Sequence, residues 1–189
     1  LYHTGQYGVF SQACHLGADQ VILPRFTPEA FLQAVERHRA NHAYLGPPMF
    51  VQLLRLPAPV RQQHDVSSLD CLVQTGAPCA PAIKRKMIDW LGPVIWEVYG
   101  ASECSLISAS SSREWLERPG TVGRPLRRVV ILDATGSPCP AGQMGEIYLD
   151  LTDLPGLRYQ NARVRRRAVG PTDLVSVGDR GWLDTAGYL

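Results

Sequence analysis

Apolar positions in the first part of the chain alternate between the spacing of helices and the spacing of buried strands. Apolar residues three or four positions apart predict helices over residues 9–16, 28–41, 49–56 and 81–91. Short apolar runs bounded by Gly, Pro or polar residues predict strands over residues 19–23, 43–45, 69–74 and 94–98. Strands that alternate with helices are typical of a layered α/β fold, so we expect a mostly parallel sheet with flanking helices.

The predicted helices also carry local signals. Thr27 is the expected N-cap of the second helix, because its hydroxyl can accept a hydrogen bond from a backbone amide of the first turn. Pro28 suits the first helical position, because the backbone N–H that proline lacks would have no partner there. The polar, Pro-containing stretch 57–68 predicts a surface loop. For the helix over residues 81–91, core spacing predicts four apolar side chains facing inward and three basic ones facing solvent: Ile83, Met87, Trp90 and Leu91, and then Lys84, Arg85 and Lys86.

After about Glu117 the helical periodicity disappears. Short β-like runs follow over residues 129–133, 146–151 and 174–177, and turn-rich stretches such as 134–138 separate them. This pattern predicts a small β-rich, barrel-like subdomain. We therefore expect an α/β subdomain over residues 1–117 and a β-rich subdomain over residues 118–189.

Composition and charge narrow the classes of function. The chain of 189 residues is 45% hydrophobic and 19% charged, as in ordinary globular proteins, and its formal net charge of +2 gives no reason to expect nucleic acid or a membrane surface as a partner. The five cysteines show no CxxC spacing, which argues against a zinc ribbon and favours reduced thiols in the cytoplasm. No apolar run has transmembrane length, and no leader is recognisable. The missing initiator Met predicts a piece of a longer protein.

One candidate site follows the strand over residues 94–98. Residues 99–103, Tyr-Gly-Ala-Ser-Glu, offer an aromatic face, a flexible glycine, a hydroxyl and a carboxylate. These groups can stack on a base, approach and hydrogen-bond a phosphate, and hold a magnesium ion. Ligands of α/β sheets usually bind at strand ends. Taken alone, the stretch is more simply a strand that leads into an exposed loop.

Two further segments have the same character. Residues 75–78, Thr-Gly-Ala-Pro, follow another predicted strand, and their small side chains let a flat ring lie against the backbone. Asp179, which follows Gly178, can accept hydrogen bonds from ribose hydroxyls. Each segment alone is more simply an ordinary turn.

In their order along the chain, these motifs resemble the adenylate-forming superfamily of acyl-CoA synthetases, luciferases and peptide-synthetase adenylation domains. The start, Leu-Tyr-His-Thr-Gly, is similar to the substrate-gate motif of that superfamily, and residues 75–78 to its adenine-contacting segment. The other matching segments are residues 99–103, 120–125 (Gly-Thr-Val-Gly-Arg-Pro), 145–147 (Gly-Glu-Ile) and 178–189.

The resemblance implies a nucleotide site. Tyr99 would stack on adenine, Ser102 would contact the α-phosphate, Glu103 would help to hold magnesium, and Asp179 would bind the ribose. The other face of the base would be lined by Gly76, Ala77 and Pro78. Ser102 and Glu103 are thus the implied catalytic residues, and Glu103 is the implied metal ligand.

The resemblance also implies the acid substrate and the reaction. His3 would border the acid-binding pocket, and Gly100 would lie near its floor beside the nucleotide. A carboxylic acid, most simply a fatty acid, would attack ATP to give an acyl-adenylate and pyrophosphate, and coenzyme A would then displace AMP. ATP, magnesium and coenzyme A are therefore the implied cofactors, and the acid is the implied small-molecule partner.

Alternatives remain at this point. An amino-acid or aryl-acid adenylation domain shares the chemistry but passes the acyl group to a carrier protein, and a noncatalytic nucleotide-binding module shares only the fold. In the superfamily, the phosphate loop lies upstream of the gate motif and the catalytic lysine lies beyond the segment that matches residues 178–189. We therefore expect the chain to work together with these parts of the same polypeptide, and to be inactive alone. The sequence leaves open the acid, the acceptor thiol and the oligomeric state.

Overall fold

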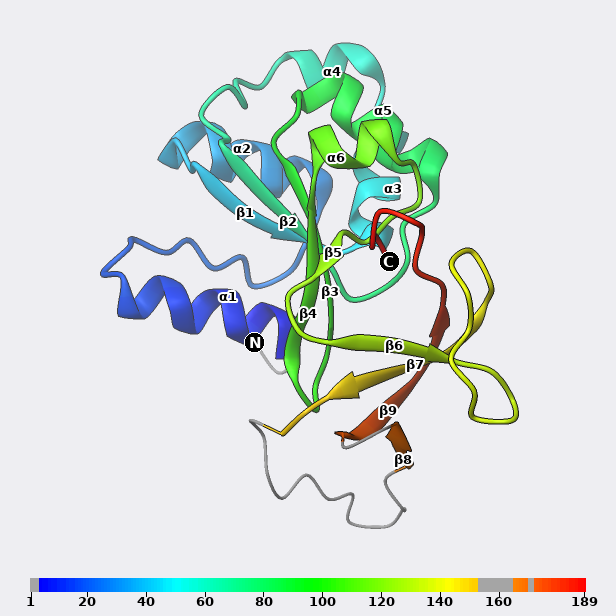
Figure 1. Ribbon diagram of the computed structural model, residues 1–189. Coiled ribbons are helices and arrows are strands. Elements are labelled where there is room, and N and C mark those ends of the chain that lie inside the picture. Colours follow the sequence, from blue (N-terminus) through cyan, green and yellow to red (C-terminus); the bar gives the residue numbers. More distant parts are fainter. Residues whose placement is uncertain (1–3, 153–164, 170–171) are drawn as a thin grey trace. The chain divides into compact units, whose positions relative to one another are not determined.

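The computed structural model describes residues 4–152, 165–169 and 172–189, and these residues form two compact units (Figure 1). The first unit comprises Leu1–Glu97 and Ser111–Gly120, and the second comprises Val98–Ser110 and Thr121–Leu189. The units interleave along the chain. The division at Glu117 stays a prediction about the subdomains of the protein.

Helices and parallel strands alternate in the first unit. Its helices are α1 (Thr4–His15), α2 (Pro28–His38), α3 (Pro47–Arg55), α4 (Ala58–Gln62), α5 (Pro81–Leu91) and α6 (Ser112–Glu117). Its strands are β1 (His42–Leu45), β2 (Cys71–Gln74) and most of β3 (Ile95–Ala101). β1 pairs with β2, and β2 with β3, in parallel register. The expected α/β fold is confirmed.

The helix boundaries follow from local chemistry. Thr27 caps α2, because its Oγ1 accepts a hydrogen bond from the Ala30 amide at 3.2 Å, as the sequence predicts. Gly92 ends α5 at a φ of 81°, which only glycine adopts without strain. The core then forms where α2, α3 and α5 pack on the strands, and its buried members are Phe31, Leu32, Val35, Leu45, Phe50, Leu53, Leu69, Leu72, Met87, Ile88, Ile95 and Trp115.

Antiparallel pairing dominates the second unit. Its strands are the end of β3, then β4 (Ser105–Ser111), β5 (Arg124–Pro125), β6 (Val129–Leu132), β7 (Gly145–Asp150), β8 (Arg166–Val169) and β9 (Thr172–Gly181). Taken together, the described strands of the chain form two sheets. One is a mixed sheet of order β1-β2-β3-β4-β5, and the other is an antiparallel sheet of order β6-β7-β9-β8. The second sheet is the expected β-rich part. The core of this unit contains Ile107, Ile131, Ile147, Leu149 and Val175.

Three local predictions are wrong. Residues 19–23 form no strand, and Val21 and Ile22 are 47% and 58% exposed, because no neighbouring strand pairs with them. The predicted loop over residues 57–68 contains the short helix α4, which begins after Pro57. The first helix begins at Thr4, several residues earlier than its apolar pattern indicates.

The largest correction concerns Lys84, which the sequence placed in solvent. Its side chain is fully buried, and its Nζ lies 2.5 Å from Oε2 of Glu97 on β3 and 5.0 Å from the centre of the Trp115 ring. Burial lowers the pKa of Lys84, and the neighbouring Glu97 carboxylate opposes that effect. The buried ion pair therefore ties α5 to β3 inside the first unit.

No helix in the described ranges is long and apolar enough to cross a membrane. All five cysteines lie in those ranges, and none of them forms a disulfide. Burial raises the pKa of the Cys79 thiol to about 11, with a further contribution from Glu97, so this thiol stays protonated at neutral pH.

Candidate functional site

The end of β3 presents the predicted Tyr-Gly-Ala-Ser-Glu motif. The strand runs to Ala101, three residues further than predicted, so Tyr99 and Gly100 are strand residues. A turn over residues 102–104 then leads into β4. On this turn Ser102 is exposed and Glu103 is half-buried. The hydroxyl and the carboxylate that the sequence singled out are thus held on a short connection between two paired strands.

Gly100 is required by a close backbone approach. A Cβ atom placed on Gly100 would lie 2.2 Å from the carbonyl oxygen of Ser105, which is far inside van der Waals contact. Any side chain at this position would push β3 and β4 apart. The glycine is therefore explained by strand packing, and its proposed place near an acid substrate stays a prediction.

Asp179 is presented by a bulge in β9. Glu146 of β7 pairs with Arg180, whereas Tyr148 pairs with Ser176, so residues 177–179 lie opposite Ile147 alone. Gly178 supports this shape with a φ of +93°. Bulges of this kind bend a strand and change the direction of its side chains. Here the bulge leaves the Asp179 side chain exposed.

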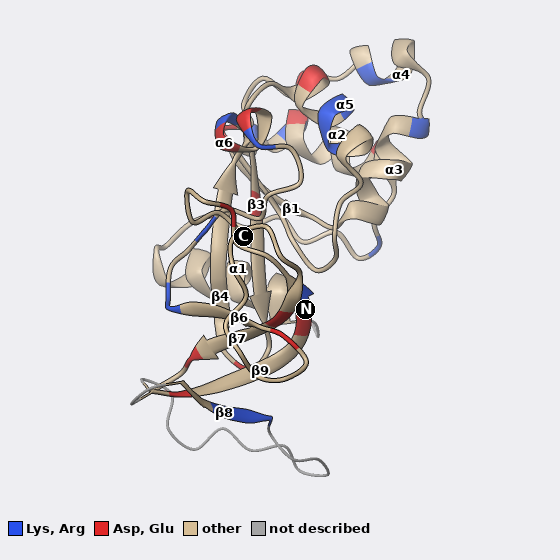
Figure 2. Ribbon diagram, turned by 45° about the vertical axis from the view of Figure 1, so that its right-hand side comes forward, with Lys and Arg blue, Asp and Glu red and all other residues tan. Residues whose placement is uncertain are grey.

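A polar network holds the bulge. The Gly178 amide donates to Oγ of Ser176 at 3.0 Å, and the Ser176 hydroxyl donates to Oε1 of Glu146. Arg165, just before β8, forms an ion pair with the same Glu146 oxygen at 2.8 Å. Figure 2 colours part of the β8 ribbon blue for Lys and Arg positions. Arg166 of β8 pairs with Asp173 of β9 at 2.8 Å. The strands on either side of β9 thus brace the segment that carries Asp179.

Tyr99 and Asp179 meet within the second unit, although 80 residues separate them. The Tyr99 hydroxyl donates to Oδ2 of Asp179 at 2.7 Å. The Tyr99 ring packs against the core of the unit, beside the buried Cys104. Burial, followed by the hydrogen bond and the charge of Asp179, raises the pKa of Tyr99, so the phenol stays neutral and can act as a donor. An aromatic face and a carboxylate therefore lie side by side.

The adenine-contacting segment lies in the first unit. Gly76, Ala77 and Pro78 are exposed on the turn after β2. The buried side chain of Gln74 supports this turn, because its Nε2 donates to the Ala77 carbonyl at 3.3 Å. The place of these three residues beside a nucleotide stays a prediction. His3 lies outside the described residues.

Tyr44 is a candidate that the sequence did not single out. A Cβ atom on Gly5, at the start of α1, would lie 2.9 Å from the Tyr44 hydroxyl, and one on Gly76 would lie 3.7 Å from it. Burial raises the pKa of Tyr44. Gly5 and Gly76 therefore lie close to this hydroxyl in the first unit. In the sequence Tyr44 appears only as an apolar position of a short strand, so its contacts were not predictable.

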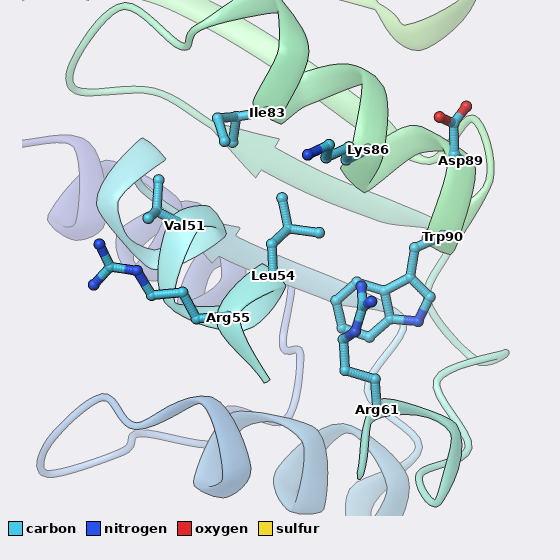
Figure 3. Close-up of a pocket in the computed structure, with 8 residues that line it drawn as sticks. All are labelled: Val51, Leu54, Arg55, Arg61, Ile83, Lys86, Asp89 and Trp90. Carbon is cyan, nitrogen blue, oxygen red and sulfur yellow. The ribbon is translucent and has the colours of Figure 1, made fainter. Parts of the chain in front are cut away.

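A separate depression of about 550 Å³ lies on the face formed by α3, α4 and α5 (Figure 3). Arg61 stacks over the Trp90 ring there, 4.9 Å from its centre. The other residues that line it are Val51, Leu54, Arg55, Ile83, Lys86 and Asp89. None of the residues predicted to bind nucleotide, acid or metal is among them.

Comparison with known proteins identifies the family. Residues 1–152 match the family model described as AMP-binding enzyme, so the chain belongs to that family. It is 27% identical over its whole length to 4-coumarate–CoA ligase-like 2 of Arabidopsis thaliana and 25% identical to the long-chain-fatty-acid–CoA ligase of Bacillus subtilis. It spans about a third of each, 34% in both cases.

Solved structures show the same likeness. The amide bond synthetase McbA from Marinactinospora thermotolerans superposes with a TM-score of 0.70 over 88% of this chain and 34% of its own, at 30% identity. The predicted relation to the adenylate-forming superfamily is thereby confirmed, and the chain corresponds to part of the large N-terminal domain of such enzymes.

Proposed function

We propose that this chain forms part of the nucleotide site of an ATP-dependent acid–thiol ligase, which makes an acyl-adenylate and transfers the acyl group to coenzyme A. The observation that carries the proposal is the contact between Tyr99 and Asp179, because it puts a stacking surface next to an acceptor for ribose hydroxyls. Membership of the AMP-binding enzyme family supports the choice of an adenine nucleotide as the ligand.

The proposed roles follow the chemistry of the residues. The Tyr99 ring stacks on adenine, and the Asp179 carboxylate accepts bonds from the ribose. Ser102, exposed on the turn after β3, donates to the α-phosphate. Glu103, on the same turn, attracts the metal ion that offsets the negative charge of the phosphates. Gly76, Ala77 and Pro78 cover the other face of the base in this proposal.

The single carboxylate of Glu103 is compatible with magnesium as the metal ion. No group of three or more His, Cys, Asp or Glu side chains able to hold a metal occurs among the described residues. Magnesium does not need such a group, because it is usually bound by one or two carboxylates together with substrate phosphates and water. Glu103 is therefore the residue that we propose to face the metal, and the ion would neutralise phosphate charge when bound.

The acid is proposed to be a fatty acid bound near His3 and Gly100. Relatives of the chain include ligases whose names refer to long-chain fatty acids and to 4-coumarate, so aliphatic and aryl acids are both to be assayed. Coenzyme A is the proposed acceptor, and the names of both relatives support it.

Acid-dependent exchange of pyrophosphate into ATP tests the proposal. The natural protein that contains this chain should catalyse exchange with at least one member of a panel of fatty and aryl acids, because adenylation is reversible before the thiol arrives. Adding free coenzyme A should then release AMP and form the thioester, whereas a carrier-linked thiol should not replace it. Exchange without transfer to coenzyme A would indicate a carrier-loading domain, and no exchange with any acid would argue against an adenylating enzyme.

A further inference from the structure

The half-buried Tyr99 side chain has a defined partner for its hydroxyl. The hydroxyl lies 2.7 Å from Oδ2 of Asp179, on a strand whose bulge is held by Ser176 and Glu146. The bulge fixes the backbone of Asp179, but its side chain is exposed and the terminal torsion of Asp is broadly distributed, so the backbone alone does not set the orientation of the carboxylate. The Tyr99 hydroxyl contacts the Asp179 carboxylate through this hydrogen bond.

The chemistry of the contact fixes the direction of the hydrogen bond. An ionised carboxylate only accepts, so Tyr99 must be the donor, and its raised pKa keeps the proton in place at any ordinary pH. A carboxylate offers about four lone-pair positions, and Tyr99 uses one of them on Oδ2. Oδ1 and the other lone pair of Oδ2 have the chemistry to accept the two hydroxyls of a ribose.

We propose that the Tyr99 hydroxyl is a positioning group that holds the Asp179 carboxylate in the orientation in which it accepts the ribose hydroxyls. This inference rests on the nucleotide-binding function proposed above. It assigns two separable tasks to one side chain, because the ring stacks on the base and the hydroxyl acts through Asp179. The hydroxyl therefore contributes to the preference for ribonucleotides over 2′-deoxyribonucleotides.

A double-mutant cycle separates the two tasks. Binding of ATP and of 2′-deoxy-ATP is measured by calorimetry on the natural protein, on Tyr99→Phe, on Asp179→Ala and on the double variant. Tyr99→Phe keeps the ring, so it should weaken ATP binding by about threefold to tenfold through the lost orientation of a charged acceptor. It should weaken 2′-deoxy-ATP binding less. In the Asp179→Ala background the same substitution should change ATP binding by less than about twofold, because the hydroxyl no longer has a carboxylate to hold.

Two control variants complete the design. Tyr148→Phe removes a hydroxyl from a buried tyrosine elsewhere in the second unit, and it should leave the ratio of the two affinities unchanged. Tyr99→Leu removes the ring as well, and it should weaken ATP binding both in the natural protein and in the Asp179→Ala variant. If Asp179→Ala does not fold, as judged by circular dichroism, Asp179→Asn takes its place in the cycle.

The outcomes distinguish this inference from the proposed function. Equal losses for Tyr99→Phe with and without Asp179, or no loss with Asp179 present, would overturn the positioning role while ATP binding itself stands. If the natural protein binds no ATP, or if Tyr99→Leu and Asp179→Ala both bind it normally, the proposed site fails and the inference fails with it. A loss of ATP affinity on Tyr99→Phe that appears only when Asp179 is present supports the positioning role.

Discussion

Replacing Lys84 with Met should destabilise the first unit by about 3–5 kcal/mol, because it leaves the Glu97 carboxylate buried without its partner. Met has a similar volume, so the loss reflects the unpaired charge rather than a cavity. For a chain of this size the change lowers Tm by about 6–20 °C. The transition can be followed by tryptophan fluorescence, since the Lys84 ammonium lies 5.0 Å from the centre of the Trp115 ring.

Two further variants show whether the ion pair is the cause. Lys86→Met changes an exposed lysine on the same helix, and it should alter stability by no more than about 0.5 kcal/mol. The double variant Lys84→Met/Glu97→Leu removes both charges and should recover most of the lost stability. A Lys84→Met protein as stable as the Lys86→Met protein would show that Lys84 is not buried against Glu97.

Glu103→Gln should slow adenylation by about tenfold to thousandfold, the range for removing one electrostatic group from a transition state. The substitution keeps the shape of the side chain but removes the charge that is proposed to attract magnesium. Pyrophosphate exchange by the natural protein, measured at increasing magnesium concentrations, provides the rate. The loss should be partly recovered as the magnesium concentration rises.

Glu117→Gln is the matched control for Glu103→Gln. Glu117 is an exposed carboxylate on α6 that pairs only with its neighbour Arg118 among the ion pairs described, at 3.3 Å, and its substitution should leave the exchange rate unchanged. An exchange rate within about twofold of the natural protein for Glu103→Gln at every magnesium concentration would remove Glu103 from the metal site, because the loss of a transition-state charge is much larger.

The parts of the fold with local causes were predictable from the sequence. Helix α5 has the predicted bounds, Pro81–Leu91, because Pro suits a first turn and Gly92 supplies the positive φ at which the helix ends. Thr27 likewise marks the start of α2. The change from helical to β-like periodicity after Glu117 indicated the β-rich part correctly, because the apolar spacing changes from the period of a helix to that of a strand.

The parts with non-local causes were not predictable. Helical spacing alone places Lys84 on a polar face, and its burial depends on Glu97, which belongs to a strand reached only after α5 has ended. The bulge at Gly178 depends on the register between β7 and β9, which no local pattern encodes. The family resemblance implied only that Tyr99 and Asp179 bind the same nucleotide. Their direct hydrogen bond was not predicted, because nothing near either residue in the sequence indicates the other.

A crystal structure of the natural protein with AMP tests the central claim most directly. We predict that the ribose hydroxyls lie within hydrogen-bonding distance of the Asp179 carboxylate, that adenine stacks on the Tyr99 ring, and that the Tyr99 hydroxyl still contacts Asp179. AMP bound elsewhere would contradict the account, and the depression where Arg61 stacks on Trp90 offers a specific alternative, since it also combines an aromatic ring with positive charge.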